Sequence, residues 1–248
     1  MNQISQVFIF CAGRGERMRP ITDSIPKPLV KINNKSILDY ILPKVAKINS
    51  IQKIIINGFY LANQISDHLK NYRDLKIEFS LETEKLETGG GLKFAKDKID
   101  FNQPLLLING DVIWLEKAQS DIELLTQAWF KSDCDLLLGL KKIKDYHGFE
   151  ARKNGKIGDF NMVNSKLYRN LESDMDYAYI GMQIINPKIL NQVNKTCFSV
   201  GEFFNMIDQN NQVKRALGVE MAGEYFHISD VKAIKQTEEL LQQNCQNI

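Results

Sequence analysis

Val7-Phe8-Ile9-Phe10-Cys11 is a short apolar run, and it leads directly into Ala12-Gly13-Arg14-Gly15-Glu16-Arg17-Met18-Arg19-Pro20 and then Pro26-Lys27-Pro28-Leu29. The apolar run predicts a buried strand, and the glycines and prolines after it predict a loop. Glycines allow backbone N–H groups to approach an anion closely, and the arginines and lysine add positive charge around it. The stretch therefore predicts a phosphate-binding loop, with a solvated turn as the alternative.

Two well-known phosphate loops do not fit this stretch. The dinucleotide-binding fingerprint needs a third glycine three positions after the second, where this chain has Met18. The P-loop needs Gly-Lys followed by Ser or Thr, and no such sequence follows the first strand. Neither fingerprint fits, so a phosphate site formed by this loop would be of another kind.

Length and composition set the broad class. With 248 residues the chain is long enough for one sizeable α/β domain. Its 32 basic and 30 acidic residues nearly balance, which argues against nucleic acid as a partner. No apolar run reaches membrane-spanning length and no export signal is evident, so we expect a cytoplasmic protein that does not bind membranes. The four cysteines are widely scattered and are expected to be free thiols: Cys11, Cys134, Cys197 and Cys245.

Strands and helices are expected to alternate along the chain, an order that favours a mainly parallel sheet. Strands are predicted at residues 7–11, 53–57, 75–81, 104–108, 135–140, 177–185 and 213–217, and helices at 36–48, 61–69, 121–131, 201–208 and 231–242. A short helix should begin at Pro187. From Tyr146 the pattern changes, and a hairpin with arms at 149–152 and 156–160 predicts a small antiparallel excursion.

Three further glycine or acidic positions are candidates for function. Gly89-Gly90-Gly91 predicts a turn whose backbone lies flat against a ligand, although a flexible connector is the alternative. Asp111 follows a continuous apolar strand, where open α/β sheets bind ligands, although Asn109-Gly110-Asp111 is also ordinary turn chemistry. Gly181 lies within a predicted strand, where a glycine can mark a bulge.

The first strand, its glycine loop and Pro26-Lys27-Pro28-Leu29 together resemble the signature of the sugar-1-phosphate nucleotidyltransferases, also called nucleotide-sugar pyrophosphorylases. The resemblance covers about the whole chain and is strongest before Asp111. It implies a three-layer, Rossmann-like α/β fold, with residues 1–140 binding the nucleotide and residues 141–248 binding the sugar phosphate. Glu87-Thr88-Gly89-Gly90-Gly91 is most similar to a branch that includes N-acetylmuramate-1-phosphate uridylyltransferases and some mannose-1-phosphate guanylyltransferases.

The resemblance also implies roles for individual residues. Arg17 would stabilise the leaving pyrophosphate, Lys27 would neutralise the α-phosphate, and Asp111 would hold Mg²⁺, with Mn²⁺ as a substitute. The residues that the resemblance places at the nucleotide are Ala12, Gly13, Gly15, Glu82, Gly89 and Gly90. Gly181 would line the sugar pocket. The partners are then an NTP and a sugar 1-phosphate, the product is a nucleotide sugar of the kind used in the cell envelope, and the protein is a monomer or homodimer.

The chain departs from the family pattern at two places. His227 stands where the family usually has a second metal-binding aspartate, and imidazole is a poor magnesium ligand. The family's sugar-phosphate lysine has no clear counterpart, since Lys166 lies in the right region without the motif. Two other functions therefore stay open: a nucleotide-binding regulatory module with weakened catalysis, and a nucleotidyltransferase that acts on phosphocholine with CTP.

Overall fold

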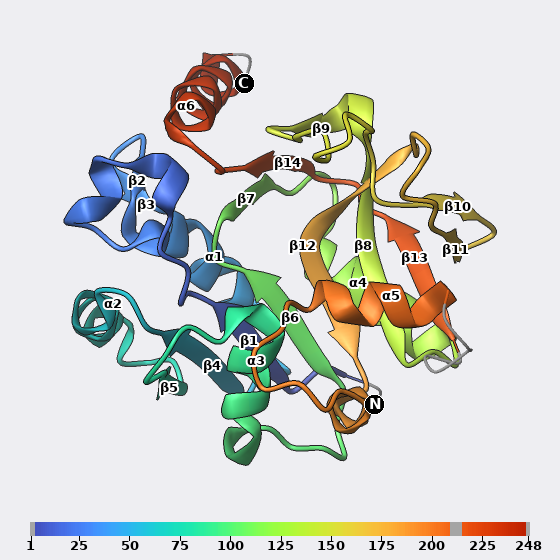
Figure 1. Cartoon of the computed structure of the whole chain (residues 1–248). Helices are drawn as coiled ribbons and strands as arrows, with labels where there is room; N and C mark the ends of the chain where they lie inside the picture. The colour runs from blue at the N-terminus through green and yellow to red at the C-terminus, as the bar shows by residue number, and fades with distance from the viewer. Residues whose placement is uncertain (1–2, 209–214, 247–248) are drawn as a thin grey trace.

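The computed structural model describes residues 3–208 and 215–246, and its main element is a nine-stranded mixed sheet (Figure 1). The strand order is β10-β11-β13-β8-β12-β6-β1-β4-β5. The strands are β1 (Gln6–Phe10), β4 (Lys53–Gly58), β5 (Ile77–Leu81), β6 (Leu105–Asn109), β8 (Leu136–Lys142), β10 (Asn161–Val163), β11 (Lys166–Tyr168), β12 (Tyr177–Ile185) and β13 (Ala216–Glu220). β5, β4, β1 and β6 form a parallel block, while β12 is antiparallel to β6 and β8.

Helices cover both faces of this sheet. α1 (Ile37–Ala46), α2 (Ala62–Leu69) and α4 (Asp121–Lys131) pack on one hydrophobic cluster, and α3 (Glu87–Phe94) and α5 (Gly201–Asp208) pack on another. Figure 1 shows α5 in front of the sheet and α4 behind it. In β1 the side chains of Val7 and Ile9 belong to the first cluster and that of Phe8 to the second, so a continuous apolar run is what this strand requires. The predicted three-layer α/β fold is confirmed.

A second, three-stranded sheet stands beside the carboxyl end of β6. It consists of β7 (Val112–Leu115), β14 (Glu224–His227) and β9 (Tyr146–His147), in the order β7-β14-β9. β14 is antiparallel to β7, with His227 opposite Val112. Because this register continues to the backbone N–H of Ile228, which donates to the Asp111 carbonyl at 2.9 Å, residues more than a hundred positions apart are brought together.

The remaining elements are short or terminal. β2 (Lys31–Ile32) and β3 (Lys35–Ser36) form a hairpin before α1, and Ser36 caps α1 in a capping box with Asp39. A 3₁₀ helix, Pro187–Gln192, stands where a short helix was predicted. α6 (Val231–Gln246) ends the described part and contacts β14 and β2. Within residues 3–208 and 215–246, no helix has the length and apolar character needed to cross a membrane.

Most predicted elements are confirmed, several to the residue. α4, α5 and β12 have the predicted bounds. The predicted strand at 213–217 overlaps β13 only at residues 216–217, since β13 begins at Ala216 and runs to Glu220; residues 213–214 lie outside the described part. Three of the cysteines are free as predicted, namely Cys11, Cys134 and Cys197; the side chain of Cys245 is not among those described.

Two predictions about local structure are wrong. The arms predicted at 149–152 and 156–160 do not form strands, and the antiparallel hairpin is instead β10 and β11. Its two-residue turn is Asn164-Ser165, both with positive φ (48° and 64°), the geometry that tight hairpins prefer. The glycines 89–91 are not in a loop, because they lie inside α3.

Each of these glycines allows a neighbour to approach α3 closely. A Cβ at Gly89 would lie 2.3 Å from the Phe198 ring, and one at Gly90 would lie 2.3 Å from the Thr196 carbonyl oxygen. The backbone N–H of Gly90 also donates to the Phe198 carbonyl at 2.9 Å. Gly89 and Gly90 are therefore needed for α3 to pack against residues 196–198. This packing stabilises the helix even though glycine weakens helices.

Candidate active site

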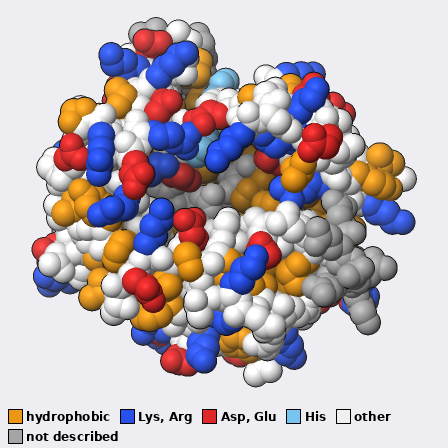
Figure 2. All heavy atoms as spheres, in the orientation of Figure 1, with side chains coloured by type: hydrophobic (Ala, Val, Ile, Leu, Met, Phe, Trp, Pro, Cys, Tyr) orange, Lys and Arg blue, Asp and Glu red, His pale blue; other side chains and the backbone are white. Residues whose placement is uncertain are grey.

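A cavity of about 500 Å³ lies at the carboxyl ends of the parallel strands β1, β4, β5 and β6. The chain runs from β1 to β4 and β5 on one side and then crosses to β6 on the other, so the cavity is at the point where the strand order reverses. Figure 2 shows this face of the molecule hollowed near its centre, with basic and acidic side chains around the hollow. The lining residues include Ala12, Gly13, Gly15, Arg17, Lys27, Asn57, Phe59, Glu82, Leu86, Asn109 and Asp111.

Seven of the predicted site residues therefore line one cavity: Ala12, Gly13, Gly15, Arg17, Lys27, Glu82 and Asp111. His227 is beside it, in contact with Asp111. Gly89 and Gly90 are buried in α3 and do not line the cavity; the part of its wall near α3 is formed by Leu86, Glu87 and Thr88.

Gly181 is at a bulge and does not line the cavity. It has φ +78° and interrupts the register of β12 with β8, so the bulge interpretation is confirmed. A Cβ at this position would lie 2.9 Å from Cβ of Asn109, a residue of the cavity wall. Contact between Gly181 and a sugar stays a prediction. Lys166, which the sequence left unassigned, is an exposed residue of β11.

The loop after β1 uses its two glycines differently. A Cβ at Gly13 would meet no atom within 4 Å, so this residue faces open space in the cavity. Gly15 has φ +66°, and a Cβ there would lie 2.9 Å from Cγ2 of Thr22 and 3.1 Å from Cβ of Lys27. The Thr22 hydroxyl donates to the Gly15 carbonyl at 2.7 Å. Gly15 is therefore needed for the turn that brings the loop against Lys27.

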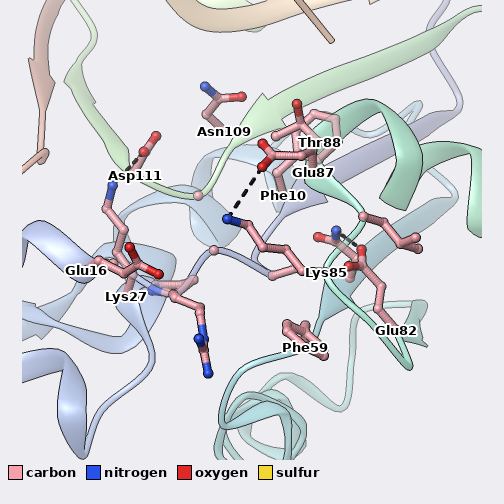
Figure 3. Close-up of a pocket in the computed structure, with 18 of the residues that line it drawn as sticks. Phe10, Glu16, Lys27, Phe59, Glu82, Lys85, Glu87, Thr88, Asn109 and Asp111 are labelled. Carbon is pink, nitrogen blue, oxygen red and sulfur yellow. Dashed lines mark hydrogen bonds and ion pairs between the residues drawn. The ribbon is translucent and has the colours of Figure 1, made fainter. Parts of the chain in front are cut away.

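Lys27 and Asp111 form an ion pair inside the cavity. The Lys27 Nζ lies 2.7 Å from Oδ2 of Asp111, and their side chains are only 12% and 25% exposed (Figure 3). The His227 Nε2 lies 3.5 Å from the same oxygen. Burial by itself would raise the pKa of Asp111, but the Lys27 ammonium and the His227 imidazole outweigh it and hold that pKa below its ordinary value. Asp111 is therefore a carboxylate with positive charge beside it.

Gly110 positions this carboxylate. Its backbone N–H donates to the Phe10 carbonyl at 3.0 Å, which ties the end of β6 to the end of β1. A Cβ at Gly110 would lie 2.3 Å from the same carbonyl oxygen. The Asn-Gly-Asp sequence is thus more than a solvated turn, because only glycine permits this approach of the two strand ends.

Arg17 lines the cavity and forms an ion pair with Glu150, which follows β9. Both side chains are about half exposed, at 56% and 46%. A hydrogen bond with Ser229 is the main reason that the pKa of Glu150 lies below its usual value, and the Arg17 guanidinium adds to the effect against burial. The guanidinium is thus present at the cavity, where an anionic ligand would compete with Glu150 for it.

At another part of the cavity, Glu82 is held by a buried polar chain. The Asn57 Nδ2 donates to Oε1 of Glu82 at 2.6 Å, and the backbone N–H of Cys11 donates to Oδ1 of Asn57 at 2.7 Å. Glu82 is 4% exposed, and its burial raises its pKa to about 7 even though the Asn57 hydrogen bond lowers it. This carboxyl group therefore holds its proton more tightly than an ordinary glutamate does.

Sequence reasoning missed several of the wall residues. Asn57 is the next-to-last residue of β4 and Asn109 is the last residue of β6, so the rule that ligands bind at the carboxyl ends of parallel strands could have found them. Glu150 and Ser229 lie in segments without a regular pattern, and no sequence signal links them to Arg17.

A divalent metal would find few ligands from the protein alone. In the part of the chain that the structure describes, no group of three or more His, Cys, Asp or Glu side chains could hold a metal ion. However, Oδ1 of Asp111 is buried and has no hydrogen-bond partner among those residues. Mg²⁺ usually binds one or two carboxylates and completes its coordination shell with substrate oxygens and water. A free carboxylate oxygen in a cavity with room for phosphates fits this preference.

The sequence of the chain is similar to those of known nucleotidyltransferases. The Nucleotidyl transferase family profile matches residues 6–149. N-acetylmuramate alpha-1-phosphate uridylyltransferase of Caulobacter vibrioides is 26% identical over 239 residues, covering 94% of this chain and 96% of its own. D-glycero-alpha-D-manno-heptose 1-phosphate guanylyltransferase of Aneurinibacillus thermoaerophilus is 30% identical over 145 residues, covering 58% of this chain and 60% of its own.

Two solved structures share the fold across nearly the whole chain. A UDP-glucose pyrophosphorylase complexed with UDP-glucose has a TM-score of 0.75 at 16% identity, covering 98% of this chain and 100% of its own. An inositol-1-phosphate CTP transferase from T. maritima has a TM-score of 0.74 at 12% identity, covering 96% of this chain and 95% of its own. At these identities the likeness concerns the fold.

Proposed function

Because the chain belongs to the nucleotidyl transferase family, we propose that it transfers a nucleotidyl group from an NTP to a sugar 1-phosphate and releases pyrophosphate. The observation that carries the proposal is the pair of Lys27 and Asp111, 2.7 Å apart, inside a cavity that the glycine loop after β1 also lines. This arrangement offers backbone donors, a cation and a carboxylate to one polyphosphate.

The reaction needs charge stabilisation more than covalent help. An oxygen of the sugar phosphate attacks the α-phosphorus, and the bond from that phosphorus to the β-phosphate oxygen breaks as pyrophosphate leaves. Lys27 would neutralise the α-phosphate as the new bond forms, and Arg17, once released by Glu150, would bind the departing pyrophosphate. Backbone N–H groups around Gly13 would orient the phosphates.

Asp111 would hold a divalent cation, Mg²⁺ or Mn²⁺. Its buried, unpartnered Oδ1 supports this role, and the proximity of His227 makes that imidazole a candidate second ligand. A metal ion bound there supplies positive charge to the phosphate oxygens. Lys27 competes with such an ion for Asp111 and would turn toward the α-phosphate when the ion binds.

The favoured substrates are UTP with N-acetylmuramate 1-phosphate or GTP with mannose 1-phosphate. The uridylyltransferase of C. vibrioides, which aligns along nearly the whole chain, supports the first pair, and the heptose guanylyltransferase supports a guanine nucleotide. The enzyme would then act in the cytoplasm, as a monomer or homodimer, in making nucleotide sugars for the cell envelope.

One panel of reactions tests the proposal. The purified chain is incubated with Mg²⁺, each of the NTPs in turn, and a set of sugar 1-phosphates together with phosphocholine, and pyrophosphate release is measured. Release that depends on one NTP and one sugar 1-phosphate supports the proposal. Release with CTP and phosphocholine would support the other acceptor class. Nucleotide binding without release from any pair would support the regulatory module instead.

A further inference from the structure

Arg17 reaches the cavity from a segment whose backbone is fixed. It follows Gly15 in the 3₁₀ turn Glu16–Met18, and the side chain of Met18 is fully buried. The backbone N–H of Met18 donates to the Gly15 carbonyl at 2.8 Å. The base of the Arg17 side chain is therefore held in place, while the long side chain itself is 56% exposed at the cavity and can reorient.

Glu150 is held by the second sheet. It follows β9, which pairs in parallel with β14. Gly148 has φ +78° and brings the chain onto β14, since a Cβ there would lie 2.4 Å from the His227 carbonyl oxygen. The His147 ring also stacks on the Phe226 ring, with the centroids 4.8 Å apart. The segment that leads to Glu150 is thus packed in place whether or not the ion pair with the glycine loop forms.

Ser229 gives the Glu150 carboxylate a second partner besides Arg17. Ser229 is a buried residue of the cavity wall, and its hydrogen bond is the main reason that the pKa of Glu150 lies below its usual value. An ionised carboxylate therefore stays at the cavity when the guanidinium turns away. In the ion pair, this carboxylate occupies the place that an anionic ligand of Arg17 would take.

We propose that Glu150 is a positioning residue that takes Arg17 back from pyrophosphate after the transfer and so promotes the release of this product. A carboxylate that competes for the guanidinium weakens the binding of any anion that Arg17 holds. Once freed from Arg17, the same carboxylate also repels the phosphates. The inference rests on the proposed function in that pyrophosphate leaves the α-phosphorus at Arg17.

The expected size of the effect follows from the exposure of the pair. Both side chains are about half exposed, and an exposed ion pair changes an equilibrium constant by about fivefold or less. Repulsion between the carboxylate and the phosphates is screened at such a position and adds a factor of about two. Removing the charge of Glu150 should therefore tighten pyrophosphate binding about 3- to 10-fold.

The experiment measures the dissociation constant of magnesium pyrophosphate by calorimetry on the full chain, in the wild type, Glu150→Gln, Arg17→Met and the double variant. Glu150→Gln should tighten binding about 3- to 10-fold when Arg17 is present. It should tighten binding no more than about twofold in Arg17→Met, where only the repulsion is left to remove. The nucleoside monophosphate of the preferred base lacks the β- and γ-phosphates, so its affinity should be the same for the wild type and Glu150→Gln.

Glu87→Gln is the matched control. Glu87 lines the same cavity and is 48% exposed, but its partner is Lys85 (Figure 3). Its replacement should change pyrophosphate affinity by the same small factor with and without Arg17. An equal effect of Glu150→Gln in the two backgrounds, or an effect of the same size on the monophosphate, would overturn the inference.

Urea unfolding shows whether each variant folds. If Glu150→Gln does not, Ser229→Ala serves instead, because it removes the second partner of the carboxylate and should also tighten pyrophosphate binding in an Arg17-dependent way. Unchanged pyrophosphate affinity in that variant would equally overturn the inference.

The outcomes separate this inference from the proposed function. Arg17-dependent tightening in a chain that releases no pyrophosphate with any acceptor contradicts the proposed function alone. Transfer to a sugar 1-phosphate, with pyrophosphate inhibiting Glu150→Gln no more strongly than the wild type, contradicts the role of Glu150 alone.

Discussion

Replacing Lys27 by methionine removes the ammonium group at the centre of the cavity and keeps most of the side-chain volume. At 2.7 Å and an effective dielectric constant of about 20, the attraction between Nζ and one full negative charge is about 6 kcal/mol. Desolvation offsets a large part of this in the unliganded protein. Without Lys27, the stabilisation of the charge that develops on the α-phosphate in the transition state should fall by about 3–4 kcal/mol. This loss corresponds to a decrease of about 10²- to 10³-fold in kcat.

Lys27→Met should lower the free energy of unfolding by less than it raises the activation free energy of the reaction. The pair is partly exposed, so its loss should lower the free energy of unfolding by about 1–3 kcal/mol, below the cost of breaking a fully buried pair. Pyrophosphate release at saturating NTP gives kcat, and urea unfolding gives stability. Lys85→Met is the matched control, because Lys85 lines the same cavity but is 64% exposed and paired with Glu87; its kcat should stay within about threefold of the wild type. A folded Lys27→Met variant with similarly preserved kcat would refute the assigned role.

The other predictions concern stability. Gly110→Ala should lower the free energy of unfolding by about 1–3 kcal/mol, because its Cβ would meet the carbonyl that ends β1, whereas Gly13→Ala, which meets no atom within 4 Å, should leave stability unchanged in urea unfolding. Glu82 has a folded pKa of about 7 against an ordinary value of 4.5, so the folded chain binds its proton more tightly. The contribution of Glu82 to the free energy of unfolding should therefore fall by up to about 3 kcal/mol as the pH rises from about 4.5 to 7. In a pH series of unfolding curves, Glu82→Gln should remove this dependence of the unfolding free energy on pH. Ser36→Ala should cost about 1 kcal/mol by removing the cap of α1, and an unchanged melting curve would show that the capping box contributes nothing.

Sequence periodicity was enough for the parallel half of the fold. The runs at β1, β4 and β6 are apolar on both faces because each strand packs between two helical layers. The first residue of a helix was predicted most accurately where a capping residue marks it, as Ser36 does at the start of α1. The antiparallel hairpin was misplaced because Lys153-Asn154-Gly155 and Asn164-Ser165 are both good turn sequences, and only the pairing of β11 with β13 decides between them.

The candidate site was predictable where one segment supplies it and not where distant segments meet. The glycine loop, Lys27 and Asp111 could be read as a phosphate site from local chemistry. The helical conformation of Gly89 and Gly90 could not, since these two glycines are required by contact with residues 196–198, about a hundred positions away. The chain from Cys11 through Asn57 to Glu82 joins three strand ends, and its pKa consequence depends on burial that no local pattern encodes.

The central claim is that the α-phosphate and its nucleoside move from the NTP to a sugar phosphate. It is tested most directly with two batches of the preferred NTP, one labelled with radioactive phosphorus at the α position and one at the γ position, each incubated with the chain, Mg²⁺ and the sugar 1-phosphate. The account predicts that the α label appears in a nucleotide sugar and the γ label in pyrophosphate, and that neither transfer occurs in Asp111→Asn. Appearance of the γ label in the sugar product would contradict it.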